Sequence, residues 1–532
     1  MVAVMDRDQQ VGLVGSKLVY PDGSLQEAGG IIWKDASGWN YGRLKDPDAP
    51  EFNYLKETDY ISGASNLIRK EIWDRLKGLD ERYVPAYFDD SDLAFSIRQL
   101  GYKTIYQPLS VVIHYEGLTH GTSTSSGTKR YQELNAVKFI DKWKTVLNEE
   151  HFNNGEDVFV ARDRSRYKKT VVVIDHYVPH FDKDAGSRTT FQLLQLFVKL
   201  NYNVKFIGDN FFRHEPYTTQ LQQLGIEVLY GPWYQDHWQD WVSENREFID
   251  FFYLNRPHIA VKYINEIREL TKAKIIYYGH DLHYVREQRQ YEIEKRPELL
   301  QSVEEWKTIE TGLFRKSDEI LTLSSDEKEI IEKETGKNNV HIIPAFYYSS
   351  FQQPITNFNE RAHLLFIGGF DHKPNVDAIV WFIKEVWPIV SEKLKNIKFL
   401  VAGSNPPEEI KSFASETVNI LGYLSDEALH NLYKTVKLVV IPLRYGAGVK
   451  GKTVEAMYHG VPFVTTRFGI EGLKDINLVT TSCDTATEFA GRVIELYNNE
   501  QELISFSKKA IEYAGRNFSE TNAKNIINTV FA

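Results

Sequence analysis

Residues 169–209 read KTVVVIDHYVPHFDKDAGSRTTFQLLQLFVKLNYNVKFIGD and predict the fold of the middle of the chain. KTVVVID (169–175) is a continuous apolar run, which is typical of a strand buried on both faces of a parallel sheet. A loop with Asp and Gly follows, then an amphipathic helix (189–201) and a second apolar strand (203–209). This strand-helix-strand order predicts a doubly wound α/β domain.

A second alternation of the same kind begins at HLLFIGG (363–369) and continues through KFLVAGS, VNILGY, LVVIPL and PFVTT. We therefore predict two consecutive Rossmann-like domains, over 169–346 and 362–515, joined by 347–361. A C-terminal helix over 516–532 is expected to pack back on the first of them. In open sheets of this kind, ligands bind at the carboxyl ends of the strands, and here we also expect binding between the two lobes.

The composition is that of an ordinary folded protein, with 42% hydrophobic and 26% charged residues. The net charge of −10, with basic residues spread along the chain, argues against a nucleic-acid-binding protein. The single cysteine, Cys483, fits a reducing compartment. The start lacks the pattern of a signal peptide, and no apolar run is long enough to span a bilayer. We expect a cytoplasmic protein, with peripheral attachment to the inner face of the membrane left open.

The segment GAGVKGKT (446–453) fits the phosphate-loop pattern G-x-x-x-x-G-K-[ST] and follows an apolar run. One interpretation is a nucleoside triphosphatase loop, but such a loop normally follows the first strand of its domain, and no later strand supplies a magnesium-binding Asp. A second is a tight strand-to-helix turn that needs glycine. A third is another kind of phosphate site, formed by amides of residues 447–450 with Lys450 or Lys452 as counter-charge. The choice between the two lysines stays open.

Three stretches resemble glycosyltransferase family 4, the retaining enzymes of GT-B architecture. They are GAGVKGKTVEAMYHGVPFVTTRFGIEGL (446–473), FIGGFDHKPNVDAIVWF (366–382) and VVVIDHYVPHFDKDAGSRTTFQLLQLF (171–197). The resemblance covers about 169–515. It implies two Rossmann-like doubly wound domains in the GT-B arrangement. It also implies a nucleotide-sugar donor held by the C-terminal lobe and a glycan or lipid-linked glycan acceptor held mainly by the N-terminal lobe.

The resemblance implies a donor site around residues 446–455. Glu455 fits the second of two family glutamates and would accept hydrogen bonds from the ribose, although a charge that complements the helix dipole is the alternative. The first glutamate would fall at Ala447 and is missing, so amides at Ala447, Gly448 and Val449 are expected to substitute. Lys450 or Lys452 would balance the diphosphate as it departs. Other donor-facing residues implied by the resemblance are Gly368, Gly369, Tyr423 and Leu424.

In the N-terminal lobe, the resemblance places a glycine loop in the interlobe cleft, with Arg188 able to meet phosphate. A helix N-cap by Ser187 is an alternative that can coexist with this role. His280 matches the family's cleft histidine and would contact the donor sugar. The other cleft residues are Asp184, Gly186, Asp281 and Arg286. This family needs no metal, so none is expected in this part.

Residues 12–147, within a predicted front domain over 1–147, resemble glycosyltransferase family 2, the inverting enzymes of GT-A architecture. YVPAYFDDSDLAFSIRQLGYKTIYQP (83–108) carries the likeness, and Asp90 matches the general base. Close carboxylates at Asp89 and Asp92 can raise its pKa. The nucleotide-binding front half of that fold is expected to be lacking, so Mg²⁺ or Mn²⁺ would be needed only by a complete domain. The polar residues 148–168 predict a linker.

The leading hypothesis is a hexosyltransferase-type, nucleotide-sugar-dependent glycosyltransferase that retains anomeric configuration. It would act in the synthesis of a bacterial surface polysaccharide such as O-antigen or capsule. One alternative is a P-loop ATPase or kinase that uses Gly446–Thr453. Another is a non-catalytic carbohydrate-binding scaffold, which the missing glutamate at Ala447 and the missing front half both favour.

Overall fold

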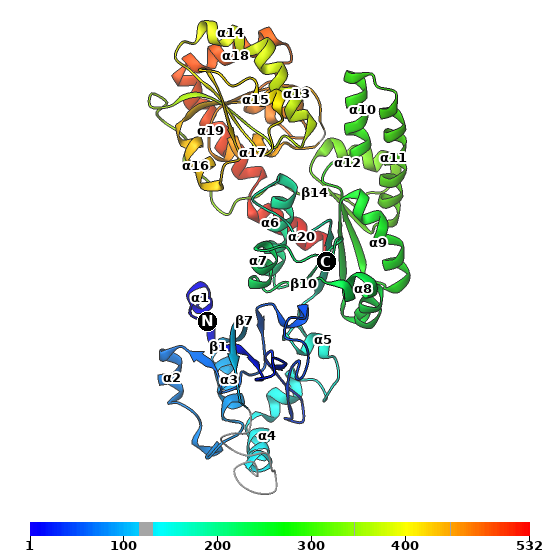
Figure 1. Cartoon of the computed structure of the whole chain (residues 1–532), viewed down its shortest axis with the longest axis vertical. Coiled ribbons are helices and arrows are strands. Elements are labelled where there is room, and N and C mark those ends of the chain that lie inside the picture. The colour runs from blue at the N-terminus through cyan, green and yellow to red at the C-terminus, as the bar shows by residue number, and fades with distance from the viewer. Residues whose placement is uncertain (116–130, 345, 447) are drawn as a thin grey trace. The chain divides into compact units, whose positions relative to one another are not determined.

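The computed structural model describes residues 1–115, 131–344, 346–446 and 448–532 (Figure 1). The chain divides into two compact units. The first unit comprises Met1–Val173, Phe197–Phe251 and Glu269–Ala273, and the second comprises Ile174–Leu196, Phe252–Arg268 and Lys274–Ala532. The domain boundaries predicted from the sequence stay predictions. In the described part of the chain, no helix is both long and apolar enough to cross a membrane.

The front of the first unit is a five-stranded mixed sheet. Its strands are β1 (Val11–Val19), β2 (Leu25–Glu27), β5 (Lys56–Glu57), β6 (Asn66–Ile68) and β7 (Lys103–Ile113). The order is β2-β1-β7-β5, and β6 also pairs with β1. β1 and β7 run parallel, whereas β2, β5 and β6 pair antiparallel with their neighbours. Every residue of β1 is buried, because helices and loops cover both of its faces.

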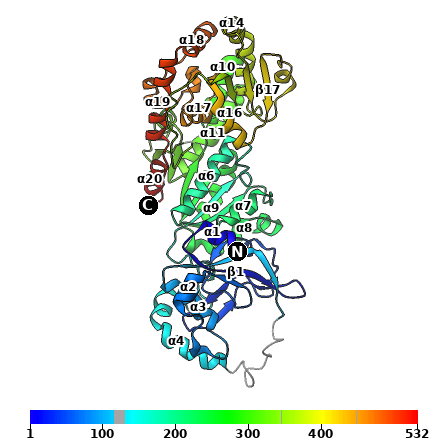
Figure 2. The same cartoon turned by 90° about the vertical axis from the view of Figure 1, so that its left-hand side faces the viewer.

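Helices accompany this sheet (Figure 2), and β3 and β4 form a separate two-stranded hairpin. These elements are α1 (Val2–Arg7), α2 (Lys70–Leu76), α3 (Asp89–Gln99), α4 (Tyr131–Glu150), β3 (Gly30–Ile32) and β4 (Gly38–Asn40). Phe95 of α3 packs edge-on against Phe139 of α4, with 5.0 Å between ring centres, and lies 5.4 Å from Trp143. These rings form the core between α3 and α4.

The middle sheet has seven strands in the order β10-β9-β8-β11-β12-β13-β14. Its strands are β8 (Thr170–Asp175), β9 (Asn203–Gly208), β10 (Glu227–Leu229), β11 (Phe251–Asn255), β12 (Lys274–Tyr278), β13 (Glu319–Thr322) and β14 (Val340–Ile342). β9 pairs parallel with β10, and β12, β13 and β14 pair parallel in succession. All residues of β8 are buried, which agrees with the prediction from its apolar run.

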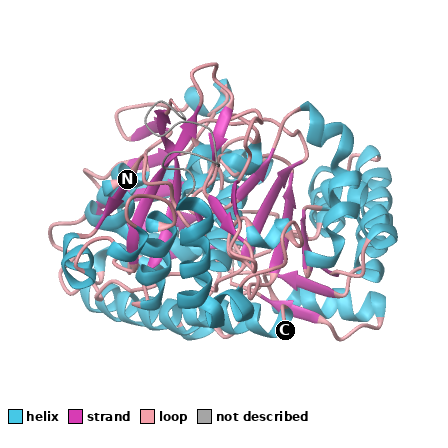
Figure 3. Ribbon diagram, turned by 90° about the horizontal axis from the view of Figure 1, so that it is seen from below, coloured by secondary structure: helices cyan, strands magenta, loops and turns pink. Residues whose placement is uncertain are grey.

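Helices alternate with these strands along the chain. Figure 3 distinguishes helices (cyan) from strands (magenta). The helices are α6 (Ala185–Lys199), α7 (Tyr217–Gln223), α8 (Pro232–Asn245), α9 (Pro257–Leu270), α10 (His283–Glu294), α11 (Glu298–Lys316) and α12 (Ser325–Thr335). α10 begins where Glu310 of α11 accepts hydrogen bonds from the main-chain amides of His283 and Tyr284, at 3.0 and 3.1 Å. This carboxylate satisfies amides that a helix start leaves without partners.

The C-terminal lobe, part of the second unit, is a parallel sheet in the order β17-β16-β15-β18-β19. Its strands are β15 (Ala362–Ile367), β16 (Phe399–Ala402), β17 (Val418–Gly422), β18 (Val436–Ile441) and β19 (Phe463–Thr465). Numbered within the lobe, this is the order 3-2-1-4-5, which is the doubly wound arrangement. Its switch point lies between β15 and β18, so the loops after these two strands are where a ligand is expected.

The helices of this lobe are α13 (Lys373–Trp381), α14 (Trp387–Lys393), α15 (Glu408–Lys411), α16 (Asp426–Thr435), α17 (Gly451–Tyr458), α18 (Ala486–Asn498) and α19 (Glu500–Asn517). A π-helical turn, Phe382–Val386, separates α13 from α14. The last helix, α20 (Glu520–Val530), packs near β14, and the ammonium group of Lys274 donates to the Val530 carbonyl at 2.9 Å.

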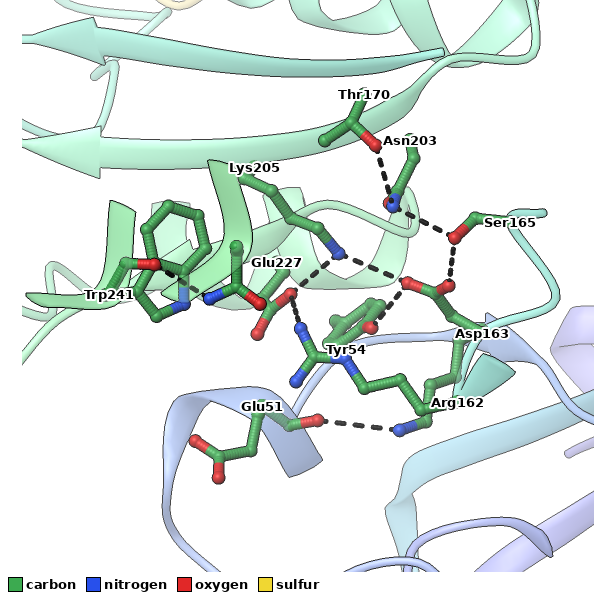
Figure 4. A network of polar contacts seen from close by, with 12 residues as sticks. Glu51, Tyr54, Arg162, Asp163, Ser165, Thr170, Asn203, Lys205, Glu227 and Trp241 are labelled. Atoms are coloured by element: carbon green, nitrogen blue, oxygen red, sulfur yellow. Dashed lines mark hydrogen bonds and ion pairs between the residues drawn. The ribbon is translucent and has the colours of Figure 1, made fainter. Parts of the chain in front are cut away.

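Residues 158–165, in the segment predicted as a linker, are largely buried within the first unit. α5 (Val158–Ala161) is followed by Arg162 and Asp163, which join a cluster of buried charges (Figure 4). Glu227 of β10 accepts from Arg162 and from Lys205 of β9, both at 2.7 Å, and Lys205 also lies 3.1 Å from Asp163. Arg162 and Asp163 of this segment thus belong to buried ion pairs.

Candidate functional site

The loop between β18 and α17 carries the glycines and lysines of the phosphate-loop pattern. Gly446 and Gly448 have φ values of +146° and +69°, which favour glycine. Lys450 is the N-cap residue of α17. The predicted donor residue Ala447 lies outside the described residues. The loop therefore places backbone and lysine side chains at a helix start, where an anion is stabilised.

Lys452, in the first turn of α17, is partly buried. Its ammonium group donates to Oδ1 of Asn375 at 2.6 Å and lies 4.2 Å from the ring centre of Phe366. Among the residues that the structure describes, no carboxylate lies within ion-pair distance of it. Burial, with the nearby Lys450, lowers its pKa to about 7. A cation enclosed without a carboxylate partner is suited to an anionic ligand.

Gly368 and Gly369 follow β15, the strand that lies beside β18 at the switch point. A Cβ atom at Gly368 would lie 2.7 Å from Nζ of Lys452 and 2.8 Å from Cγ of Asn375. Asn375 in turn donates to the Gly369 carbonyl at 2.7 Å. Glycine at 368 is therefore required for the approach of Lys452 to the strand end.

Lys450 has a different environment. Its ammonium group lies 3.7 Å from the Glu471 carboxylate, which also pairs with Arg289 at 2.5 Å. Arg289 donates to the Gly446 carbonyl at 2.7 Å. Burial lowers the pKa of Lys450, while Glu471 opposes this effect. Lys450 is thus tied to the loop by an acidic partner, which distinguishes it from Lys452.

Glu455 lies one turn after Lys452 on α17 and is partly buried. Nη1 of Arg188, from α6, lies 3.4 Å from its Oε1 atom. Burial raises the pKa of Glu455, and Arg188 opposes the change. Two residues predicted from separate motifs, one for ribose and one for phosphate, are therefore in contact.

The end of β12 carries the predicted cleft histidine, His280. Its φ of +70° is unusual for a residue other than glycine. Its Nε2 atom is buried and has no hydrogen-bond partner in the described part of the chain. Burial and the nearby Arg256 lower its pKa to about 3, so the ring is neutral at pH 7. A neutral imidazole nitrogen without a partner can accept from or donate to a ligand.

Asp281 and Arg286, also predicted for the cleft, form an ion pair with each other. Nδ1 of His283 lies 3.1 Å from the same Asp281 carboxylate. Burial lowers the pKa of His283, but Asp281 and Glu310 raise it to about 9. This group therefore holds a positive imidazole ring beside Asp281 at the start of α10.

Glu327, near the start of α12, is a candidate residue that sequence reasoning missed. It is buried, and burial raises its pKa to about 7. It accepts from the Thr322 hydroxyl at 2.5 Å, and a Cβ at Gly448 would lie 3.4 Å from its Oε1 and 3.5 Å from Cβ of Asp281. A carboxyl group thus lies beside Gly448 of the glycine loop. The sequence feature that could have identified Glu327 is its position just after the predicted strand EILTLS, where ligand-binding residues of such sheets lie.

At the start of α6, Asp184 is the capping residue. Its carboxylate accepts from the Ser187 amide at 2.8 Å and from the Ser187 hydroxyl at 2.7 Å. The alternative that Ser187 caps the helix is wrong, because Ser187 lies inside the first turn and is buried. A Cβ at Gly186 would lie 2.8 Å from Nη2 of Arg256, so this glycine allows the close approach of that side chain.

The remaining predicted donor residues lie in two places. Tyr423, after β17, is 46% exposed, and Nζ of Lys183 lies 4.7 Å from its ring centre. Leu424 and Val449 are partly buried against the core of the C-terminal lobe. An exposed aromatic face at a strand end is suited to stacking on a planar group, whereas the contacts of Leu424 and Val449 are with the core.

The environment of Thr453 argues against a nucleoside triphosphatase loop. In such a loop the hydroxyl at this position binds Mg²⁺. Here Thr453 is buried and donates to the Gly469 carbonyl at 2.6 Å. The loop also follows β18, the fourth strand of its lobe along the chain. Across the described ranges, no group of three or more His, Cys, Asp or Glu is placed to hold a metal ion.

In the front sheet, Asp90 lies in the first turn of α3 and is half-buried. It accepts from the amides of Ser91 and Gly63, at 2.7 and 3.3 Å. Burial and the neighbouring Asp89 raise its pKa to about 6. Asp92 instead accepts from Trp143 at 2.7 Å and joins α3 to α4. Asp90 thus has a raised pKa in the first turn of α3, whereas Asp92 supports the fold.

Residues 361–499 match the family model described as glycosyl transferases group 1. The match covers most of the C-terminal lobe, so this lobe is similar to glycosyltransferase domains of that group. The crystal structure of Alr3699/HepE from Anabaena in complex with UDP and glucose is similar, with a TM-score of 0.51 and 14% identity. The likeness covers 68% of this chain and 98% of that chain, and it supports the predicted GT-B fold.

Two curated relatives match shorter parts of the chain. It is 34% identical over 151 residues to the uncharacterized protein y4gI of Sinorhizobium fredii, covering 27% of this chain and 16% of that protein. It is 27% identical over 114 residues to the O-antigen biosynthesis protein RfbC of Myxococcus xanthus, covering 20% of this chain and 9% of that protein. The chain thus spans less than a fifth of the length of either relative.

Proposed function

We propose that this chain transfers a sugar from a nucleotide-sugar donor to a glycan acceptor and retains the configuration of the anomeric carbon. The observation that carries the proposal is Lys452, a partly buried cation at the start of α17 with an amide partner, Asn375, instead of a carboxylate. Such a site needs an anion, and a diphosphate leaving group supplies one. Glycine at 368 lets the Lys452 ammonium group approach the end of β15, next to the start of α17 where an anion is stabilised.

The proposed reaction breaks the bond between the anomeric carbon and the diphosphate oxygen. The electron pair stays on the diphosphate, and Lys452 stabilises the charge that develops there. The acceptor hydroxyl attacks from the same face and gives its proton to the departing phosphate. The neutral His280 would contact a sugar hydroxyl through its Nε2 atom, and Glu455 would accept from the ribose hydroxyls.

Glu327 completes this proposal. The carboxylate expected at Ala447 is missing from the sequence, and the Glu327 carboxyl group is positioned 3.4 Å from a Cβ built at Gly448. We propose that it accepts hydrogen bonds from the donor sugar in place of that carboxylate. The assignment of the two lobes to family 4 and of the front sheet to family 2 belongs to the same proposal.

We also propose that the acceptor belongs to a bacterial surface polysaccharide, carried as a free or lipid-linked glycan. The likeness to RfbC, an O-antigen biosynthesis protein, supports this. The predicted cytoplasmic location at the inner face of the membrane stays a prediction, as does the absence of a metal requirement in the GT-B part.

Turnover of a panel of UDP-, GDP- and dTDP-sugars with oligosaccharide acceptors tests the proposal. We expect one donor to release its nucleoside diphosphate and add one sugar to the acceptor. Proton NMR of the new linkage should show the same anomeric configuration as the donor. Inversion would contradict the retaining mechanism. Glycan binding without turnover of any donor would favour the scaffold alternative.

The pKa of Lys452 predicts how donor binding varies with pH. In the free protein its pKa is about 7, so the side chain loses its charge above pH 7, while a bound diphosphate favours the charged form. Affinity for UDP should therefore fall by roughly tenfold per pH unit over the first units above pH 7. Isothermal titration calorimetry from pH 7 to 9 measures this. The Lys452→Met variant should show a flat profile, and an unchanged slope in that variant would contradict the assignment.

A further inference from the structure

A pocket of about 600 Å³ lies within the first unit, away from every residue assigned to sugar transfer. Its lining residues come mainly from three segments. These are residues 46–51, residues 158–162 in and after α5, and residues 230–245, which contain α8. This volume falls in the range of about 300–1,000 Å³ that is typical of small-ligand sites. It is large enough for a short oligosaccharide.

Aromatic side chains dominate the lining. They are Tyr41, Phe159, Tyr230, Trp233, Tyr234 and Trp241. Trp233 is 52% exposed, although a tryptophan normally buries most of its surface in a folded protein. Its ring stands edge-on to Tyr234, with 4.9 Å between ring centres. An exposed, supported indole face is suited to packing against the apolar C–H face of a sugar ring.

Carboxylates supply the polar part of the lining. They are Asp46, Asp48, Glu51 and Glu244. The Tyr234 hydroxyl donates to Glu51 at 3.2 Å, which fixes one of these groups at the wall. Ionised carboxylates accept hydrogen bonds, and sugar hydroxyls donate them. The lining therefore combines stacking surfaces with acceptors, as neutral carbohydrate requires.

The charge of the lining excludes other ligand classes. Arg162 is the cation among the lining residues, and its guanidinium already pairs with the buried Glu227 at 2.7 Å and donates to the Tyr41 hydroxyl at 2.9 Å. Lys17 and Arg213 interact electrostatically with Asp48 from outside the lining, but within the lining four carboxylates face one compensated cation. This balance disfavours nucleotides, phosphates and acidic sugars. This argument separates the pocket from the diphosphate site around Lys452.

We propose that this pocket binds a neutral oligosaccharide segment of the glycan acceptor, with Trp233 as its stacking surface. The binding of neutral glycan follows from the pocket alone, whereas the identity of this glycan as the acceptor rests on the proposed function. The site would hold the growing chain while its end reacts elsewhere, which raises the effective concentration of that end.

A glycan array with neutral, acidic and amino-sugar oligosaccharides tests the proposal on the full chain. Wild-type protein should bind neutral oligosaccharides, and Trp233→Ala should weaken that binding by at least about tenfold, as loss of one stacking contact implies. The matched control is Trp73→Ala, which removes another partly exposed tryptophan, on α2, and should bind like the wild type.

Two further readouts make the result decisive. Circular dichroism should show that Trp233→Ala is folded, because the side chain is largely exposed. The rate at which the protein hydrolyses the nucleotide sugar in water should be the same in Trp233→Ala as in the wild type. This rate reports on the proposed transferase site, whereas glycan binding reports on the pocket, so the two proposals can fail independently. The absence of neutral-glycan binding, its persistence in Trp233→Ala, or a preference for acidic or amino-sugar glycans would each overturn the pocket assignment.

Discussion

Replacing Lys452 by methionine is expected to lower sugar transfer by roughly 100- to 1,000-fold, the range observed when one preorganised charge-stabilising group is removed from an active site. The reason is local. Lys452 sits between Asn375 and the strand end at Gly368, and it has no carboxylate partner among the described residues. Steady-state rates with a saturating donor and acceptor measure the loss.

Measuring the free energy of unfolding shows whether Lys452→Met loses activity without losing its fold. A partly buried ammonium group without a carboxylate partner costs free energy in the folded state, so methionine, of similar shape, should leave the unfolding free energy of the unliganded protein unchanged or higher. Lys434→Met, at an exposed position of α16, is the control and should keep full activity. Full activity of Lys452→Met, or equal losses in both variants, would contradict the role of Lys452.

The second large effect is expected in the first unit, at the buried charges around Glu227. Glu227 and Lys205 are both fully buried and 2.7 Å apart. In Glu227→Ala, Lys205 and Arg162 remain buried and share only Asp163 and neutral partners, which should destabilise the protein by about 3–5 kcal/mol. Urea unfolding followed by tryptophan fluorescence measures this loss.

Matched variants test the mechanism of this loss. Glu247→Ala removes a glutamate whose side chain is 83% exposed and should cost less than about 0.5 kcal/mol. The double variant Lys205→Met/Glu227→Leu removes both charges and should be more stable than Glu227→Ala, because no buried lysine is left with a lost partner. A loss in Glu227→Ala no larger than in Glu247→Ala would contradict the account.

The sequence predicted the two Rossmann-like alternations because buried parallel strands are nearly continuous apolar runs. KTVVVID is buried throughout as β8, and LVVIPL contains most of β18. The loop over 446–453 was recognised because its glycines and lysines are adjacent in the chain. Local patterns of this kind can be read without knowledge of tertiary contacts.

What the sequence did not reveal depends on contacts between distant segments. Asn375 meets Lys452 across 77 positions, and this contact is what distinguishes Lys452 from Lys450. Glu327 is far from the glycine loop in the sequence, and only the folded chain brings its carboxyl group beside Gly448. The residues around Arg162 and Asp163 suggested an exposed linker because their partners, Lys205 and Glu227, lie on strands later in the chain.

Binding of nucleoside diphosphates without added metal tests the central claim most directly. Isothermal titration calorimetry with UDP, GDP and dTDP in the presence of EDTA, compared with ATP and Mg²⁺, gives the measurement. We predict that at least one nucleoside diphosphate binds without metal and that Lys452→Met weakens this binding at pH 7. Magnesium-dependent hydrolysis of ATP that is lost in Lys452→Ala, with no binding of a nucleoside diphosphate, would contradict the assignment of this loop to a nucleotide-sugar donor.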